Sequence, residues 1–258
     1  MGSFRLDGRV AIVTGGGNGI GRGTAIKLAH QGASVAVCDI EKENAECVAA
    51  EIVREGGNAI GIFCDVCSVD SVRKAIRATA EKFGGVDILV NNAGGGGGGM
   101  LLDDVDYEEW DRLILLDLTS AYIFSKEVLP SMRKRGAGKI VNISSGAGII
   151  GDATDIHYAT AKAGLIGLTK AMARQVAKDH INVNALGVGP TDTRMSRKRG
   201  LEEQLNDIIW YRVAQPEDQA NAVAFLVSDE ESLLPDDVSK PSSCFSPVLS
   251  SFSVSFFS

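Results

Sequence analysis

The architecture follows from the stretch Val10-Ala-Ile-Val-Thr-Gly-Gly-Gly-Asn-Gly-Ile-Gly21. Its first five residues are apolar or β-branched, as expected of a buried strand. Gly15, Gly19 and Gly21 would let the backbone turn tightly, approach a pyrophosphate and open a helix whose free N–H groups face the anion. The spacing differs from G-x-G-x-x-G, so a glycine-rich turn without function is the alternative. The position of the motif between a strand and a helical pattern favours phosphate binding.

Short apolar runs alternate with longer helical patterns along the chain. Strands are predicted at Val10–Thr14, Ala33–Asp39, Ala59–Asp65, Val86–Asn91, Lys139–Ser144 and Ile181–Leu186. Helices are predicted at roughly Ile20–Gln31, Lys42–Glu55, Val69–Phe83, Tyr107–Arg135 and Ile156–Asp179. This alternation implies right-handed crossovers and a doubly wound parallel sheet, the Rossmann fold. A length of 258 residues suits one α/β domain.

Composition restricts the partners and the compartment. The net charge of −7 argues against nucleic acid or an anionic membrane as the main partner. No apolar run reaches membrane-spanning length, and the first eight residues lack a signal-peptide core, so we expect a cytoplasmic protein. Five cysteines are scattered, and one lone C-x-x-C (Cys64, Cys67) has no second pair. Reduced structural thiols and no metal site are therefore expected.

Acidic residues end the second and third predicted strands. Asp39 lies twenty residues after Gly19, where a carboxylate can bind an adenosine ribose and repel a 2′-phosphate. Asn18 places no basic side chain before Gly19, so NAD is favoured over NADP. Asp65, followed by Val66, could hold the adenine amino group. The alternative for both acids is a helix cap or a turn.

The fourth predicted strand ends in Asn91-Asn-Ala-Gly94, which runs into the glycines at positions 95–99. Ordering six consecutive glycines costs conformational entropy, so this loop should be mobile unless a ligand or neighbour holds it. Either a flexible lip beside a cofactor or a tolerant surface loop fits the pattern.

Chemistry is concentrated in the stretch that runs from Asn142 to Gly164. Tyr158 and Lys162 are four residues apart, so on a helix both side chains share one face. A neighbouring ammonium favours a phenolate and makes Tyr158 usable as an acid or base. Ser145, thirteen residues upstream at a strand end, could bind the oxygen that Tyr158 protonates. A surface tyrosine packed on a lysine stem is the alternative.

The ordered set T-G-x-x-x-G-I-G, N-N-A-G, Ser145 and Tyr158-x-x-x-Lys162 resembles the short-chain dehydrogenase/reductase family over about residues 6–232. The resemblance implies an NAD(P)-dependent enzyme acting on CH–OH groups. Tyr158 would be the general acid/base, Lys162 would assist it and hold the nicotinamide ribose, and Ser145 would orient the substrate oxygen. The expected cofactor-binding set is Gly15, Asn18, Gly19, Ile20, Gly21, Asp39, Asp65, Val66, Asn91, Ala93, Gly94, Tyr158, Lys162, Gly189 and Thr193.

Two departures from the family pattern lie near this site. Seven residues after Trp110, where members usually carry an asparagine that holds a proton-relay water, this chain has Asp117. We include Asp117 among the catalytic candidates, with a slower or differently pH-dependent relay expected. The family's Pro-Gly after the sixth strand appears as Val188-Gly189, which loosens the loop and keeps its hydrogen-bonding groups near the nicotinamide carboxamide, together with Thr193.

A third departure lies at the C-terminus. The resemblance predicts a seventh strand ending in Asp-Gly-Gly, but the chain gives Leu234-Pro-Asp-Asp-Val-Ser and a serine- and phenylalanine-rich tail. We predict an oxidoreductase domain at residues 1–234, with a substrate lid at about 191–212, and a disordered tail at 235–258. The alternation of Phe252, Val254 and Phe256 with serines also has the period of a strand. An altered or missing seventh strand should weaken the sheet edge and any assembly built on it.

The leading hypothesis is an NAD-dependent oxidoreductase that interconverts a secondary alcohol and a ketone. A 3-oxoacyl-thioester reductase and a cofactor-binding protein with impaired catalysis are the alternatives. The basic segment that begins at Arg194 could attract an anionic substrate or be a solvated helix face. Small residues at 159, 163, 167 and 171 permit close helix packing against the sheet or a second subunit, and family members commonly form homodimers or homotetramers.

Overall fold

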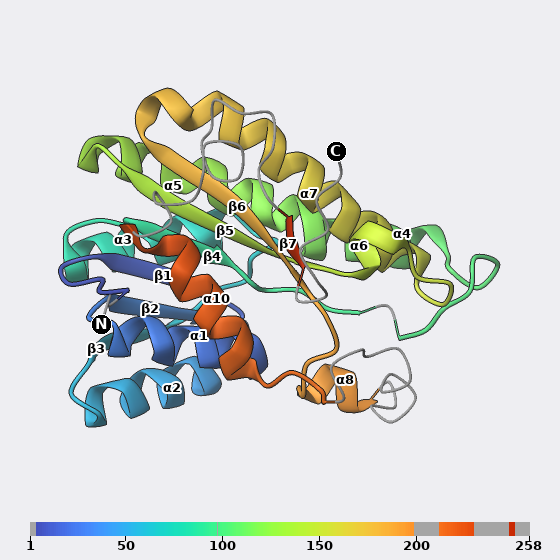
Figure 1. The fold of residues 1–258 in the computed structure, drawn as a ribbon, viewed down its shortest axis with the longest axis horizontal. Coiled ribbons are helices and arrows are strands. Elements are labelled where there is room, and N and C mark those ends of the chain that lie inside the picture. Colours follow the sequence, from blue (N-terminus) through green and yellow to red (C-terminus); the bar gives the residue numbers. More distant parts are fainter. Residues whose placement is uncertain (1–3, 97, 199–211, 230–247, 251–258) are drawn as a thin grey trace.

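Parallel strands form one twisted sheet at the centre of the molecule (Figure 1). The computed structural model describes residues 4–96, 98–198, 212–229 and 248–250. Within these residues the sheet has seven strands in the order β3-β2-β1-β4-β5-β6-β7. The strands are β1 (Val10–Thr14), β2 (Ser34–Asp39), β3 (Asn58–Phe63), β4 (Ile88–Asn91), β5 (Gly138–Ser145), β6 (Ile181–Val188) and β7 (Val248–Ser250). The strand order reverses between β1 and β4, which is where such sheets bind ligands.

Helices cover both faces of this sheet. The helices are α1 (Gly19–His30), α2 (Lys42–Arg54), α3 (Val69–Phe83), α4 (Tyr107–Ile114), α5 (Ser120–Arg135), α6 (Ala147–Ile150), α7 (Ile156–Val176), α8 (Arg194–Lys198) and α10 (Pro216–Val227). Alternate strand residues point to opposite faces. Thus Ala11 and Val13 pack with α1, α2 and α10, whereas Ile12 packs with α3, α5 and α7. Two buried cores result, as predicted for a doubly wound sheet.

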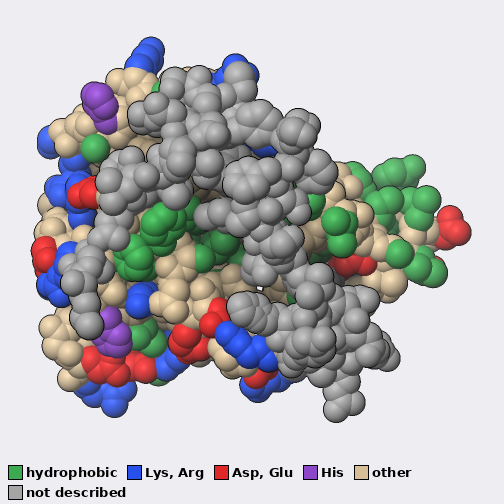
Figure 2. Space-filling model, viewed as in Figure 1, with side chains coloured by type: hydrophobic (Ala, Val, Ile, Leu, Met, Phe, Trp, Pro, Cys, Tyr) green, Lys and Arg blue, Asp and Glu red, His purple; other side chains and the backbone are tan. Residues whose placement is uncertain are grey.

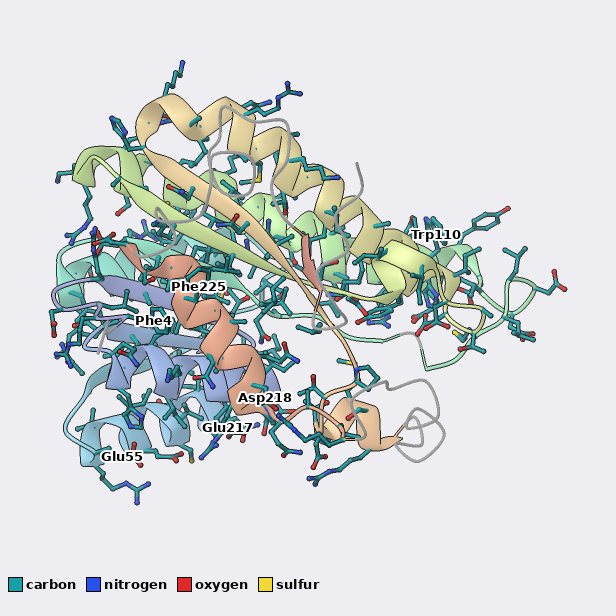
Figure 3. The ribbon with its side chains drawn as sticks, viewed as in Figure 1. Phe4, Glu55, Trp110, Glu217, Asp218 and Phe225 are labelled. Carbon is teal, nitrogen blue, oxygen red and sulfur yellow. The ribbon has the colours of Figure 1, made fainter. Side chains whose placement is uncertain are left out.

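The C-terminal helix α10 closes the first of these cores. It packs against α1, and Phe4 and Phe225 form an edge-to-face pair with ring centroids 5.7 Å apart (Figure 3). Its first turn is capped reciprocally by Gln215 and Asp218, and Pro216 occupies a position where no backbone N–H is needed. These local signals explain why the helix begins where it does.

The segment predicted as one helix over Tyr107–Arg135 is interrupted. After α4 the backbone widens into a π-helical turn, η1 (Leu115–Thr119), before α5 begins at Ser120. The prediction of an uninterrupted α-helix was wrong here, because the local sequence favours a helix and the widening coincides with a tertiary contact of Asp117. The helix predicted to end at Asp179 ends as α7 at Val176, followed by a 3₁₀ turn, η2 (Ala177–Asp179).

The seventh strand is altered and short. β7 has three residues and runs parallel to β6, pairing Ala185 with Val248 and Gly187 with Ser250. The alternating segment around Phe252–Phe256, most of the predicted tail and residues 199–211 of the predicted lid lie outside the described residues. None of the helices in the described ranges is long and apolar enough to cross a bilayer.

Candidate active site

The glycine turn after β1 has the shape of a phosphate cradle. Gly15 and Gly19 have φ angles of 59° and 52°, in the left-handed region that favours glycine. A Cβ on Gly21 would lie 2.1 Å from the Gly15 carbonyl oxygen, so any side chain at this position would clash with the backbone of the turn. α1 begins at Gly19, and the Asn18 side chain makes no capping hydrogen bond to it. The first N–H groups of α1 therefore fit the pyrophosphate of a dinucleotide.

Thr14 and Asn92, which the sequence analysis did not select, brace this turn. Asn92 donates from Nδ2 to the carbonyl oxygens of Thr14 (2.9 Å) and Gly15 (3.0 Å). Thr14 Oγ1 accepts hydrogen bonds from the backbone N–H groups of Asn92 and Ala93, both at 3.0 Å. The end of β4 and the end of β1 are thereby fixed to one another. The N-N-A-G motif was the available signal, but the partners lie about eighty residues earlier in the chain.

Asp39 lies beside the glycine turn. Its Oδ2 accepts a hydrogen bond from the Gly17 N–H at 2.8 Å, and its Oδ1 accepts one from the Glu41 N–H at 3.0 Å. Asp39 therefore does stabilise a turn, which was the alternative to cofactor binding. Its carboxylate also lies next to the glycine turn, where a bound adenosine ribose would be within reach. Asp65 also has a turn role, because its Oδ1 accepts the Cys67 N–H at 2.9 Å, and Val66 next to it is buried.

The side chain of Asn91 belongs to a buried polar network. It donates to Ser125 Oγ (3.0 Å) and to Asn142 Oδ1 (2.8 Å), and Asn142 donates in turn to Thr169 Oγ1 (2.8 Å). This chain of contacts joins β4, β5, α5 and α7. The Asn91 side-chain amide is thus used inside the protein.

Tyr158 and Lys162 come together on α7, which packs against β5, and Ser145 is the last residue of β5. Tyr158 and Ser145 are half-buried, while Lys162 is buried. Lys162 Nζ lies 5.5 Å from the centroid of the Tyr158 ring, which is cation–π distance. Ser144 Oγ donates to the Lys162 carbonyl oxygen at 2.9 Å and fixes α7 on β5. The predicted shared face of the Tyr158 and Lys162 side chains is thus observed.

Asp117 contacts Lys162 directly. Its Oδ1 lies 3.0 Å from Lys162 Nζ and accepts the Gly95 N–H at 3.1 Å. The carboxyl is buried, and its Oδ2 has no hydrogen-bond partner within the part of the chain that the structure describes. A Cβ on Gly94 would lie 2.2 Å from Oδ1, so this glycine is needed for the close approach. Asp117 lies in the π-helical turn η1, and its side chain reaches Lys162 in the candidate active site.

The charge on Lys162 is stabilised by this contact. Burial by itself would disfavour the ammonium, but the Asp117 carboxylate, followed by Tyr158, outweighs it. The pKa of Lys162 is therefore raised above the ordinary lysine value of 10.5. The site thus keeps a positive charge beside the phenol.

An open cleft of about 520 Å³ continues from the glycine turn towards the loop after β6. Asn18 and Gly19 line one side, and Thr193, Arg194 and Glu217 line the other. Glu217, in the first turn of α10, is labelled in Figure 3. The hydroxyl groups of Thr193 and Ser196 are hydrogen-bonded to each other, and Thr191 Oγ1 donates a hydrogen bond to the Gly189 carbonyl oxygen at 3.0 Å. These bonds hold the loop after β6, which lacks the family's proline. Arg197 pairs with Asp192.

The cysteines and possible metal ligands form no second site in the described ranges. Cys38, Cys47, Cys64 and Cys67 are free thiols, and no group of three metal-ligating side chains is found there. Cys244 lies outside the described residues.

Comparison with known proteins agrees with this geometry. The sequence profile of the short chain dehydrogenases matches residues 9–204. The 3-oxoacyl-[acyl-carrier-protein] reductase of Synechocystis is 39% identical over 225 residues, covering 87% of this chain and 91% of the relative. The corresponding reductase of Escherichia coli is 38% identical, covering 88% and 93%.

Solved structures give the same result. A short-chain dehydrogenase/reductase from Mycobacterium marinum superposes with a TM-score of 0.86 at 31% identity, covering 90% of this chain and 93% of that one. A protein from Beutenbergia cavernae, assigned as an NAD(P)-dependent gluconate 5-dehydrogenase, superposes with a TM-score of 0.84 at 32% identity. It was crystallised with NADP at low occupancy, and the coverage is 90% and 94%.

Proposed function

The chain belongs to the short-chain dehydrogenase/reductase family, and from this premise we propose that it interconverts a secondary alcohol and a ketone with NAD, Tyr158 serving as general acid and base. The family makes it an NAD(P)-dependent oxidoreductase acting on CH–OH groups. The observation that carries the proposal is the buried Lys162 ammonium, held beside the Tyr158 ring by Asp117. It supplies the positive charge that a phenolate needs.

Each residue has one task in the proposed reaction. In oxidation the Tyr158 phenolate takes the hydroxyl proton, Ser145 binds the substrate oxygen, and Lys162 stabilises the phenolate. NAD, held by the glycine turn and Lys162, would supply the hydride acceptor for the carbon that carries the hydroxyl, and NADH would supply the hydride in reduction. In reduction Tyr158 donates its proton to the substrate oxygen. One proton and one hydride are therefore transferred in each direction.

Replacing Tyr158 by phenylalanine tests the assignment. The variant keeps the ring beside Lys162 and removes the acid, so kcat should fall by about 10²–10⁴, the usual contribution of acid–base catalysis. NAD binding, measured by titration calorimetry, should not be abolished. A variant that retains near-parental turnover would remove Tyr158 from the mechanism. Cofactor binding without turnover of any alcohol by the parent would favour the alternative of impaired catalysis.

The preference for NAD is proposed from Asp39. Its carboxylate bonds the glycine turn at Gly17 and would repel the 2′-phosphate of NADP. Asp39→Asn removes the charge and keeps an oxygen acceptor for the Gly17 N–H. The ratio of the Kd values for NADP and NAD should drop by at least about tenfold, or about 1.4 kcal/mol. An unchanged ratio would show that Asp39 is a turn residue only.

Reduction of a 3-oxoacyl thioester is the second candidate, favoured by the relatives named 3-oxoacyl-[acyl-carrier-protein] reductase. Both candidates use the same proton and hydride transfers and differ in substrate. Polyols, hydroxysteroids and 3-hydroxyacyl thioesters should be assayed with NAD and with NADP. Turnover confined to the thioesters would select this candidate, and turnover of simple alcohols would select the first.

We also propose a cytoplasmic homodimer or homotetramer. The small residues Ala163, Gly167 and Ala171 are exposed on α7, so this stripe does not pack against the sheet. Two large apolar side chains are also exposed, Leu115 on η1 and Tyr122 on α5. An apolar surface of this kind supports close packing of a second copy, which sedimentation equilibrium would measure.

A further inference from the structure

A cluster of one imidazole and two carboxyl side chains lies next to the proposed acid/base and takes no part in the steps above. His157 directly precedes Tyr158 in α7, and its side chain is fully buried. Its Nδ1 lies 3.0 Å from Oδ1 of Asp155, which is also fully buried. Its Nε2 lies 3.6 Å from Oε1 of Glu109 on α4. Neither ring nitrogen has an aligned hydrogen bond to any described residue, and each lies close to one of these carboxyl groups.

Glu109 is itself held in place. Arg112 donates from Nε and Nη2 to its two carboxylate oxygens at 2.6 and 2.7 Å, and the Glu109 N–H is capped by Asp106 Oδ1 at 2.8 Å. Arg112 is more than half exposed and the Glu109 side chain about one-fifth exposed, so this is a bidentate pair at the surface that orients the Glu109 carboxylate. α4 therefore presents His157 with a fixed carboxylate.

α7 is thus attached at two points to one continuous segment. α4 carries Glu109, and the η1 turn that follows carries Asp117, which contacts Lys162. The two attachments, at His157 and Lys162, lie on either side of Tyr158 in the sequence. Successive residues of a helix are rotated by about 100°, so fixing His157 against α4 also fixes the direction of the Tyr158 phenol.

We propose that His157 is a positioning residue, which sets the rotation of the first turn of α7 through Glu109 and so aims Tyr158 at the substrate. The inference rests on the proposed function, because it assumes that Tyr158 is the acid/base. An imidazole has a polar ring nitrogen at each of two positions and can face both carboxyl groups, which an apolar side chain cannot do.

The test uses three variants of the full chain, assayed with the alcohol that the parent oxidises fastest in the panel described above. His157→Ala removes both contacts. His157→Gln places an amide nitrogen towards Glu109, and His157→Asn places one towards Asp155. For His157→Ala we expect kcat to fall by at least about tenfold, since a misplaced catalytic group costs up to about 10². NAD affinity and KM should stay at parental values, and His157→Gln should recover most of kcat.

A matched pair on α4 covers the case in which His157→Ala does not fold. Glu109→Gln should lower kcat, whereas Glu108→Gln, its exposed neighbour on the same helix, should not. Parental kcat in both His157→Ala and Glu109→Gln would overturn the proposal. So would equal losses in His157→Gln and His157→Ala, or a loss in KM and NAD affinity instead of kcat. Failure of the proposed function is distinguishable, because Tyr158→Phe would then leave turnover intact.

Discussion

Asp117 sets the electrostatics of the candidate active site through its contact with Lys162. An asparagine at this position would be a neutral hydrogen-bond partner for Lys162. The carboxylate instead forms a buried ion pair at 3.0 Å and raises the pKa of Lys162. The gain is a more persistent ammonium beside Tyr158, and the cost is a second buried charge whose Oδ2 is unbonded in the described structure.

We therefore predict that Asp117→Asn makes Lys162 lose its proton at lower pH. Stability from a group with a raised pKa is complete below the unfolded-state value of 10.5 and is lost as pH rises through the folded-state value. The parent should keep this stability and its turnover beyond pH 10.5, while in the variant both should decline earlier. Urea unfolding and kcat between pH 8 and about 11 measure the difference. Superimposable pH profiles would exclude Asp117 from proton handling.

Residue-scale prediction from the sequence is possible where a motif fixes spacing along the chain. The shared face of Tyr158 and Lys162 and the position of the glycine turn were predictable because each motif is local. Asn92 was missed because its partners Thr14 and Gly15 are distant in sequence. The contact of Asp117 with Lys162 was missed for the same reason, since η1 and α7 meet only in the folded chain.

Among the secondary-structure elements, β5 and α7 depend on the buried network through Asn142. Asn142 accepts from Asn91 and donates to Thr169, so it connects β4 to α7 below the catalytic end of the sheet. Buried polar groups that lose a partner keep their desolvation cost. The orientation of α7, and with it Tyr158, depends on a network that has no direct contact with substrate.

Asn142→Ala should accordingly lower the free energy of unfolding by about 1–3 kcal/mol, because the Asn91 amide and the Thr169 hydroxyl each lose a partner. Asn58→Ala is the matched control: this exposed asparagine bonds Ser34 at 2.9 Å near the sheet edge. It should change stability by no more than about 0.5 kcal/mol. Urea denaturation with equal m-values measures both, and equal losses would contradict the role of the network.

The succession of elements was predictable because each strand of the predicted sheet is a short apolar run and the helices between them are longer periodic patterns. The interruption at η1 was not, since Leu115-Leu-Asp-Leu-Thr119 is compatible with an α-helix and only tertiary contacts widen it. α6 escaped prediction because four residues give no periodicity. The short β7 likewise carries too little pattern to be recognised from three residues.

At the scale of the whole molecule, the two edges of the sheet differ. At one edge β3 pairs with β2 along six residues, whereas at the other β6, eight residues long, is covered by the three residues of β7. Figure 2 shows charged side chains of both signs over the face that carries α1 and α2, and hydrophobic ones at the projecting end of the molecule. Leu101, Leu102 and Tyr107 are among the exposed apolar residues.

Truncation at Pro235 should therefore lower both stability and assembly. It removes β7 and leaves the backbone groups of residues 185–187 on β6 without their strand partner. A few lost backbone hydrogen bonds, each with a net value of about 0.5–1.5 kcal/mol, should lower Tm by several degrees, at about 2–4 °C per kcal/mol for a chain of this size. Any assembly built on this edge of the sheet should weaken as well, because the strand that completes the edge is removed. Sedimentation and thermal unfolding of the full and truncated chains measure the two effects, and equal mass with equal Tm would show that β7 supports neither.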